Sequence, residues 1–370
     1  MRPRIAADET LVVWRKGCEM QAVKRFRRAT VLLLAAAGAL IALTAAGCGG
    51  GDDNAASGGT TGETTKPASL NVALDWFPNP DHVALYYALD KGYFDDQNLT
   101  VNFKKPSDPS AGLKLVATKR FDLAVYYEGD MFFAAEQGLP VIAVGTLIPT
   151  PLNSMIALSD SKVQGPSTIK GATIGVAGLP FDDAILQTMR QQEGLSEGDV
   201  KKVNVGFNLV PALLSKKADA VIGAYWNIEG EQVELETGKK PVIIRLEQIG
   251  VPHYDELVIV ANKDRLASDS SYADAVKRFL AGMRKGSQGA PSNRAEAIDI
   301  IKKETDYKPK EIDLMVPATL ATLKPQGGLA VGCIDLEAWE TFGKWMLDNK
   351  LLKKAIDAKT VASDKYLTGC

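Results

Sequence analysis

The chain has 370 residues, enough for two domains of ordinary size, and its 46% hydrophobic and 24% charged residues are typical of a soluble globular protein. The formal net charge is −2, and only two histidines occur. Because the sequence also has no Cys-x-x-Cys or His-rich spacing, its composition argues against a conventional metal site.

The N-terminal region predicts a secretory signal. Four basic residues lie between Met20 and residue 28, and an apolar run over 31–43 follows that is too short to span a membrane comfortably. We therefore expect residues 1–47 to be a signal peptide. Met20 is a better start than the first methionine, because residues 1–19 carry acidic residues and no feature of export.

Cys48 follows Ala-Ala-Gly, which resembles a bacterial lipobox, whose cysteine is acylated after cleavage. Ala45 stands where the usual leucine would be, and the alternative is ordinary cleavage near Ala46 with an incidental cysteine. Residues 48–67 are rich in small and polar residues and predict a flexible tether. We therefore expect an extracytoplasmic protein that is lipid-anchored to the cell membrane.

The mature chain is acidic. Residues 1–47 carry eight basic and three acidic residues, so the rest keeps 35 basic and 42 acidic residues, a formal charge of −7 that argues against nucleic acid as a partner. Of the four cysteines, Cys18 precedes the preferred start and Cys48 is expected to be acylated. Cys333 and Cys370 remain, and in an oxidising compartment we predict that they form a disulfide.

The body of the chain alternates short β-rich runs with helical patterns. The first series predicts strands over 70–74, 99–103, 123–126 and 141–147, and helices over 83–91, 111–118 and 131–137. The second series predicts strands over 154–158, 173–176, 203–205, 220–225 and 242–245, and helices over 183–193, 211–215 and 228–236. A strand over 257–261 is followed by helices over 272–286, 294–304, 311–320 and 336–349.

This alternation predicts an α/β fold with parallel sheets and right-handed crossovers. Breaks near 148–154 and 248–255 predict two lobes between which the chain crosses twice. We expect lobe 1 to comprise residues 68–148 plus 255–370, and lobe 2 to comprise residues 149–254.

Residues 119–128 and 216–225 echo each other. Each has a basic pair, an Asp and an apolar strand that ends in an aromatic residue, with a carboxylate close behind. Ligands of open α/β sheets bind at the carboxyl ends of strands, so two facing lobes would bring both clusters to one cleft. The alternative is a chance likeness between apolar strands that end in polar loops.

Three groups of residues are candidate ligand contacts. The loop after the first strand offers Trp76, with a large flat face, and Asn79, with both a donor and an acceptor; His82 follows at a helix start where Asp81 is a plausible N-cap. The other two groups follow later strands and comprise Tyr127 and Glu128, and Tyr225, Asn227 and Glu229.

Tyr225 and Glu229 are four residues apart and share a face if the helix has begun. An aromatic ring beside a carboxylate suits a flat heteroaromatic ligand that carries an amino group. Favourable placement of an acid in the first turn of a helix explains Glu229 equally well.

Catalytic motifs are missing from the sequence. It contains no Gly-x-Ser-x-Gly, P-loop or dinucleotide fingerprint. Asp182 and Asp183 are adjacent at a helix start, where acids are more often caps than an acid/base pair. We therefore expect a binding protein rather than an enzyme, with no cofactor.

Residues 74–82, followed by Tyr86 and the Lys-Gly-Tyr-Phe of 91–94, resemble the family of periplasmic proteins related to fungal thiamine-pyrimidine synthases. The likeness runs from about residue 70 to about 352 and includes residues 223–229 and 254–257. It is strongest with the subgroup that binds formylaminopyrimidine for an ABC importer. Several other subgroups bind riboflavin, sulfonates or nitrate.

The resemblance implies a type II periplasmic-binding-protein fold, with two doubly wound lobes joined by a two-strand hinge. It also implies a monomer that delivers its ligand to an ABC permease in the membrane. The pyrimidine would stack on Trp76 and Tyr225, with Glu229 on its amino group, while riboflavin is the alternative ligand. The synthase branch is an enzyme, but its cysteine-rich metal motif has no counterpart here, and residues 123–130 offer neither the lysine nor the histidine that it uses.

Overall fold

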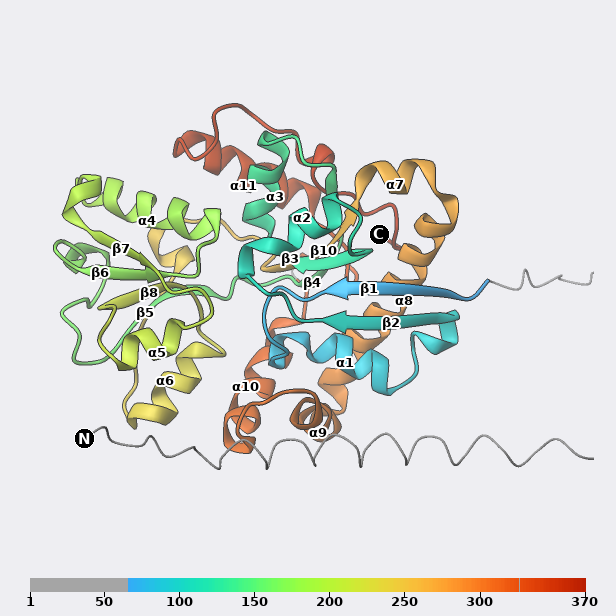
Figure 1. The fold of residues 1–370 in the computed structure, drawn as a ribbon, viewed down its shortest axis with the longest axis horizontal. Helices are drawn as coiled ribbons and strands as arrows, with labels where there is room; N and C mark the ends of the chain where they lie inside the picture. Colours follow the sequence, from blue (N-terminus) through green and yellow to red (C-terminus); the bar gives the residue numbers. More distant parts are fainter. Residues whose placement is uncertain (1–65, 326) are drawn as a thin grey trace, which may run out of the picture. The chain divides into compact units, whose positions relative to one another are not determined.

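The first sheet is built from strands before and after a long insertion. In the computed structural model, which describes residues 66–325 and 327–370, its order is β2-β1-β3-β10-β4 (Figure 1). The strands are β1 (Ala68–Ala73), β2 (Leu99–Lys104), β3 (Leu123–Tyr126), β4 (Val141–Ile148) and β10 (Leu257–Asn262). Strands β4 and β10 are buried along their whole length, so this sheet is covered on both faces.

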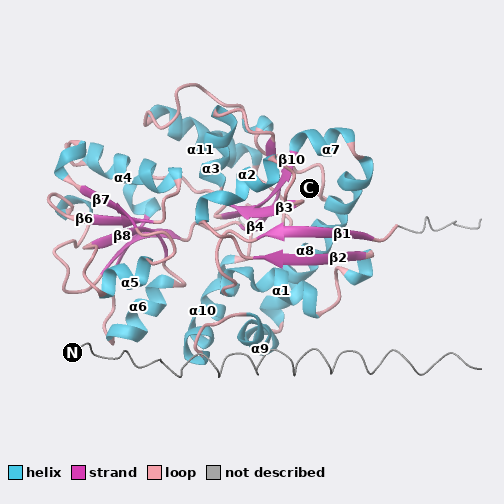
Figure 2. Cartoon of the chain, viewed as in Figure 1, coloured by secondary structure: helices cyan, strands magenta, loops and turns pink. Residues whose placement is uncertain are grey.

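The second sheet lies within the inserted segment and has the order β7-β6-β8-β5-β9. Its strands are β5 (Asn153–Ala157), β6 (Thr173–Val176), β7 (Lys201–Asn204), β8 (Ala220–Tyr225) and β9 (Val242–Arg245). Figure 2 shows each sheet with helices around it. The two boundaries that we predicted between lobes, 148/149 and 254/255, fall in the connections between the sheets.

The expectation of parallel sheets was wrong, because both sheets are mixed. Strand β10 runs antiparallel to β3 and β4, and β5 runs antiparallel to β8 and β9. Each of these is the strand by which the chain enters a sheet from the other one. A strand that comes directly from the other sheet needs no helical crossover, so it need not run parallel to its neighbours.

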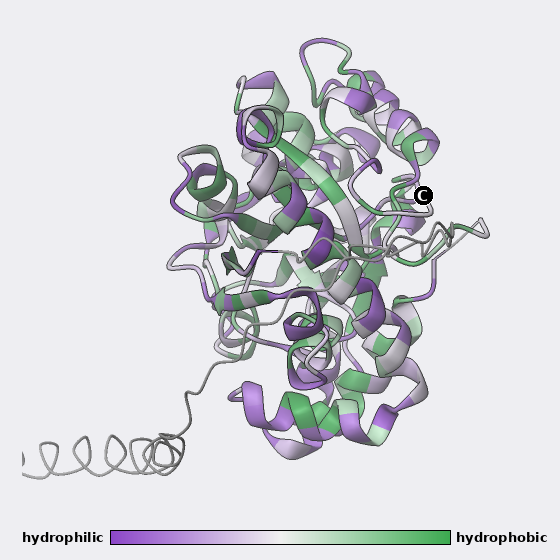
Figure 3. Ribbon diagram, turned by 90° about the vertical axis from the view of Figure 1, so that its right-hand side faces the viewer, coloured by the Kyte–Doolittle hydropathy of each residue, from purple (hydrophilic) through white to green (hydrophobic). Residues whose placement is uncertain are grey.

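Helices cover the sheets, and their amphipathic patterns agree with this position. Figure 3 shows hydrophobic residues along the inner strands and hydrophilic residues on the outer helices and loops. The helices are α1 (Val83–Asp90), α2 (Gly112–Ala117), α3 (Glu128–Glu136), α4 (Pro180–Gln192), α5 (Leu209–Leu214), α6 (Glu229–Thr237), α7 (Lys263–Ser268), α8 (Ser270–Ser292), α9 (Arg294–Glu304), α10 (Pro309–Thr322) and α11 (Leu336–Asp348). Among these, α7 was not predicted. Helix α3 begins three residues before its predicted start, which moves Glu128 and Asp130 into its first turn.

Both sheets belong to one compact unit, Glu63–Cys370. The predicted signal peptide, nearly all of the tether and the acylation site Cys48 lie outside the described residues. No helix in the described part of the chain is long and apolar enough to cross a membrane.

The C-terminal tail returns to the first sheet. Ala362 forms an isolated bridge with Ala143 of β4. Cys333 and Cys370 are joined in a disulfide with 5.5 Å between their Cα atoms. Arg284 of α8 donates hydrogen bonds to the carbonyl oxygens of Val331 and Thr368, and so contacts the chain near both cysteines of the disulfide.

Candidate functional site

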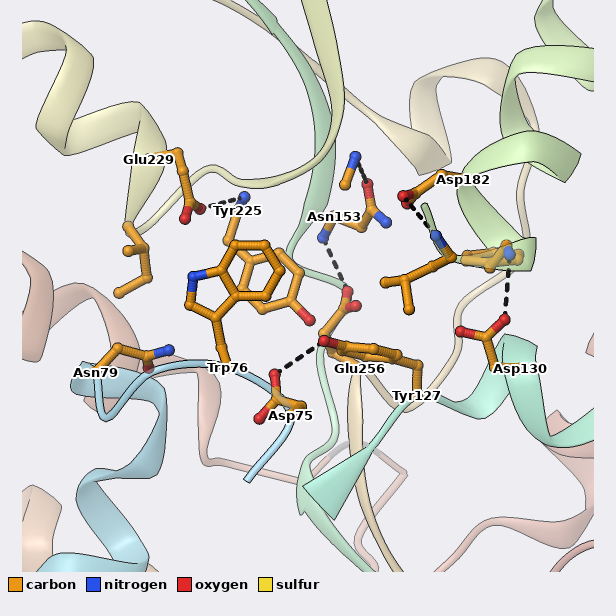
Figure 4. Close-up of a pocket in the computed structure, with 14 residues that line it drawn as sticks. Asp75, Trp76, Asn79, Tyr127, Asp130, Asn153, Asp182, Tyr225, Glu229 and Glu256 are labelled. Atoms are coloured by element: carbon orange, nitrogen blue, oxygen red, sulfur yellow. Dashed lines mark hydrogen bonds between the residues drawn. The ribbon is translucent and has the colours of Figure 1, made fainter. Parts of the chain in front are cut away.

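A narrow cavity lies between the two sheets, where loops from both meet (Figure 4). The first sheet supplies Asp75, Trp76 and Asn79 from the loop after β1, and Tyr127 and Asp130 from the end of β3 and the start of α3. The second sheet and its connections supply Asn153, Leu179, Phe181, Asp182, Gly223, Tyr225, Ile228, Glu229 and Glu256. The cavity volume is about 20 Å³, little more than one water molecule needs. A heterocyclic ring therefore enters only if side chains or lobes move apart.

The loop after β1 is shaped by its own polar side chains. Asn79 is the N-cap of the 3-10 turn Pro80–His82, and its Oδ1 accepts a hydrogen bond of 2.7 Å from the Asp81 N–H. The expectation that Asp81 is the N-cap was therefore wrong. The ring of His82 accepts from the Asn79 N–H at 3.2 Å through Nδ1, while Nε2 lies 2.8 Å from Asp75 Oδ1.

Asp81 is instead the centre of a buried network between the lobes. Its Oδ1 accepts from Asn227 Nδ2 at 2.6 Å and from the Thr319 hydroxyl at 2.9 Å. Asn227 also donates to Thr319 Oγ1 at 2.8 Å. These side chains come from the turn before α1, from the β8–α6 connection and from α10, so the network joins both lobes to a C-terminal helix. Burial raises the pKa of Asp81 to about 6.

Three of the predicted contact residues do not line the cavity. His82 and Asn227 are buried behind it in the interactions just described. Glu128 is also fully buried, and its Oε2 accepts from the Asp255 N–H at 2.7 Å, beside the second crossing between the lobes. Glu128 is the first residue of α3, and of these two neighbours only Tyr127 lines the cavity.

The remaining predicted contacts, Trp76, Asn79, Tyr127, Tyr225 and Glu229, all line the cavity. The Tyr127 hydroxyl donates to Asp75 Oδ2 at 3.1 Å. Glu229 opens α6, and its Oε2 accepts from the Tyr225 N–H at 2.8 Å. Glu229 therefore lies in the first turn of a helix and also lines the cavity, and its contact with a ligand stays a prediction. Burial raises its pKa to about 7.

Trp76 lines both the cavity and a wider groove beside it. Its ring packs edge-on against Phe207, with ring centroids 4.5 Å apart. The groove has a volume of about 580 Å³ and shares Trp76 and Glu229 with the cavity. Phe77, which borders this groove, also contacts Phe207 at 4.5 Å between centroids.

Glu256 was not predicted as a site residue. Its Oε2 accepts from the N–H groups of Leu152 and Asn153, at 2.6 and 2.8 Å, and from the Tyr254 hydroxyl at 2.9 Å. Glu256 thus links the two segments by which the chain crosses between the lobes, and it also lines the cavity. Burial raises its pKa to about 7. Only the Tyr-Asp-Glu-Leu of 254–257, quoted for the family likeness, pointed to it in the sequence.

The cavity is acidic. Five carboxylates line it and none of its lining residues is Lys, Arg or His. Such a cavity favours a ligand that donates hydrogen bonds or carries positive charge, and it disfavours an anion, because no cationic side chain lines it. Two lobes, each a mixed sheet with helices on both sides and a polar cavity between them, define the class of periplasmic binding proteins.

The chain belongs to the NMT1/THI5 like family, whose model matches residues 79–297. A relative from Haemophilus influenzae, named as a thiamine biosynthesis protein, is 35% identical over 79% of this chain and 91% of its own length. The formylaminopyrimidine-binding protein of Halalkalibacterium halodurans is 29% identical over 80% of this chain and 89% of its own length. A pyrimidine phosphate synthase of Candida albicans is 27% identical over 60% of this chain and 68% of its own length.

Solved structures show the same fold. The alkanesulfonate-binding protein of Xanthomonas axonopodis has a TM-score of 0.63 and 16% identity, with 80% of this chain and 99% of that chain covered. A Candida albicans protein described as having the generic periplasmic binding protein fold has a TM-score of 0.62 and 19% identity, with coverage of 80% and 96%. The predicted family and the predicted fold class are therefore confirmed.

Proposed function

We propose that this protein is the extracytoplasmic solute-binding component of an ABC importer, and that it binds an aminopyrimidine precursor of thiamine between its lobes. The observation that carries the proposal is the acidic cavity with aromatic walls and no cationic lining residue. The relative named as a formylaminopyrimidine-binding protein supports the ligand class, because that relative matches nearly the whole two-lobed body.

Trp76 and Tyr225 would cover the faces of the pyrimidine, and Glu229 would accept a hydrogen bond from its amino group. Glu229 Oε2 is held by the Tyr225 N–H, which leaves Oε1 for the ligand. Riboflavin is the second candidate, and the observation in its favour is the wide groove beside Trp76. The relative named as a formylaminopyrimidine-binding protein favours the pyrimidine.

The test is mass spectrometry of ligand released from the full chain purified without additives, followed by calorimetry. An aminopyrimidine should bind, and taurine should not, because its sulfonate would enter a cavity of carboxylates. Binding of taurine alone would overturn the ligand class. Binding of riboflavin alone would favour the second candidate.

We further propose that Cys48 is acylated, that the protein acts as a monomer and that it is not a synthase. The signal-like segment before Cys48 supports the anchor. Intact mass of membrane-extracted protein should show a diacyl or triacyl adduct on a chain that begins at Cys48, whereas a mature form that starts elsewhere would contradict this. A Schiff-base absorbance band after incubation with pyridoxal phosphate would instead favour a synthase.

A further inference from the structure

Two carboxylates at one end of the cavity play no part in the site proposed above. Figure 4 shows Asp130 and Asp182 on one side, with Trp76, Asn79 and Glu229 on the other. Asp130 lies in the first turn of α3 and Asp182 in the first turn of α4, so each lobe supplies one of them. Both are buried, with exposed fractions of 2% and 0%.

Each carboxylate has one oxygen bound by the backbone and one oxygen free. Asp130 Oδ1 accepts from the Phe181 N–H at 3.1 Å, and Asp182 Oδ2 accepts from the Ala177 N–H at 3.0 Å. Asp130 Oδ2 and Asp182 Oδ1 are buried and have no hydrogen-bond partner within the described chain. Placement at the start of a helix accounts for the bound oxygens. It does not account for the free ones, since buried polar atoms are normally paired.

The local backbone makes room for Asp182. Gly223 lies in β8 with φ of +88°, and a Cβ atom there would lie 2.7 Å from Asp182 Oδ1. The Gly223 N–H is turned toward Asn153 Oδ1, at 3.1 Å. A side chain at position 223 would thus displace the free oxygen of Asp182 from its place at the cavity wall.

No cation within the described residues balances the two acids. Neither Asp130 nor Asp182 forms an ion pair in that part of the chain. Lys114 borders a separate groove that Asp130 also lines, but it makes no ion pair with Asp130. Burial and the neighbouring carboxylate raise the pKa of Asp182 well above its ordinary value, and burial raises the pKa of Asp130 to about 7.

We propose that Asp130 and Asp182 form a second subsite that binds a protonated amine of the ligand, opposite the end where Glu229 receives the ring amino group. This inference rests on the proposed binding of an aminopyrimidine. A ligand with a nitrogen donor at each end would satisfy the free oxygens at both ends of the cavity. An ammonium group would also supply the positive charge that the lining residues lack.

The test compares three 2-aminopyrimidines that differ only in the substituent at C5, across the ring from the amino group: aminomethyl, formylaminomethyl or hydroxymethyl. Calorimetry on the full chain should show that the charged aminomethyl compound binds at least about tenfold more tightly than either the neutral formylaminomethyl or the neutral hydroxymethyl compound, because hydrogen bonds between charged groups are the stronger ones. Asp130→Asn and Asp182→Asn keep an oxygen for the backbone N–H. They should reduce this preference to about threefold or less.

Asp183→Asn is the matched control. Asp183 follows Asp182 in α4, is 51% exposed and pairs with Lys202 at 2.8 Å outside the cavity. This variant should keep the full preference. Unchanged binding of the hydroxymethyl compound by Asp130→Asn and Asp182→Asn would show that both remain folded.

The outcomes separate the two proposals. If wild type binds the aminomethyl and hydroxymethyl compounds equally, the second subsite is wrong while aminopyrimidine binding stands. If both Asn variants keep the preference, some other group provides it and the assignment is likewise overturned. If none of the three compounds binds, the proposed function fails, and the subsite fails with it.

Discussion

At the scale of single residues, position after a strand located side chains at or near the cavity, without separating those that line it from those buried behind it. Trp76, Asn79, Tyr127, Tyr225 and Glu229 line the cavity as the sequence suggested. His82 and Asn227 do not. His82 pairs with Asp75, which the sequence analysis did not consider, and Asn227 donates to Asp81, which it treated as a helix cap. Asp81 and Asn227 are 146 residues apart in the chain, so no local pattern reveals their pairing.

Removal of the aromatic walls or of the acid near Tyr225 should weaken binding. Trp76→Ala, Tyr225→Ala and Glu229→Gln should each cost about 1–3 kcal/mol of binding free energy, through lost stacking or a lost charge-assisted hydrogen bond. Calorimetry with an aminopyrimidine measures this. Glu231→Gln is the control, since Glu231 lies in the same helix and does not line the cavity. Wild-type affinity in both Glu229→Gln and Tyr225→Ala would show that the site is elsewhere.

Loss of the Asn227 side chain should lower the stability of the fold, because this side chain belongs to the buried network and does not line the cavity. Asn227→Ala leaves Asp81 Oδ1 with one donor fewer in a buried position, which should lower the free energy of unfolding by about 1–3 kcal/mol. Denaturant unfolding of this variant should be compared with Asn208→Ala, which changes an exposed residue. Equal free energies of unfolding for the two variants would contradict the structural role assigned to the network.

At the scale of elements, most strands and helices follow from the sequence to within a residue or two. β3, β6, β8, β9 and α9 begin and end where the pattern placed them. Strand direction was not predictable for β5 and β10, because apolar composition marks a buried strand without giving its partner. Helix α7 was missed because it is short and is followed directly by the longer α8.

The bridge at the C-terminus should stabilise the tail against the first sheet. The two cysteines are 37 residues apart, and closure of a loop of that length contributes about 4 kcal/mol on the chain-entropy model. Cys333→Ser should therefore lower the unfolding temperature in the absence of reductant, and reductant should lower that of wild type but not of the variant. A count of two reactive thiols in unreduced, denatured wild type would reject the bridge.

At the scale of the whole molecule, buried acids make stability depend on pH. Burial raises the pKa values of Glu229 and Glu256 from 4.5 to about 7. Between these values the folded state holds protons that the unfolded state has lost, so stability falls as pH rises through this window. Each group can account for a change on the order of 3 kcal/mol.

Ligand-free protein should accordingly unfold at a higher temperature at pH 5 than at pH 8. Glu229→Gln should reduce this dependence, because the amide does not titrate, while Glu197→Gln at an exposed position should leave it unchanged. Thermal unfolding followed by circular dichroism measures both effects. Equal unfolding temperatures across this range would contradict the assignment.

The acidic cavity has a consequence for how the two lobes would close under the proposed function. Above pH 7 the carboxylates of Glu229 and Glu256 carry charge and repel each other across the cavity. A solute that donates hydrogen bonds or carries positive charge would reduce this repulsion and so favour the closed arrangement. A lysine in the lining would remove this dependence, because the lobes could then close without a solute.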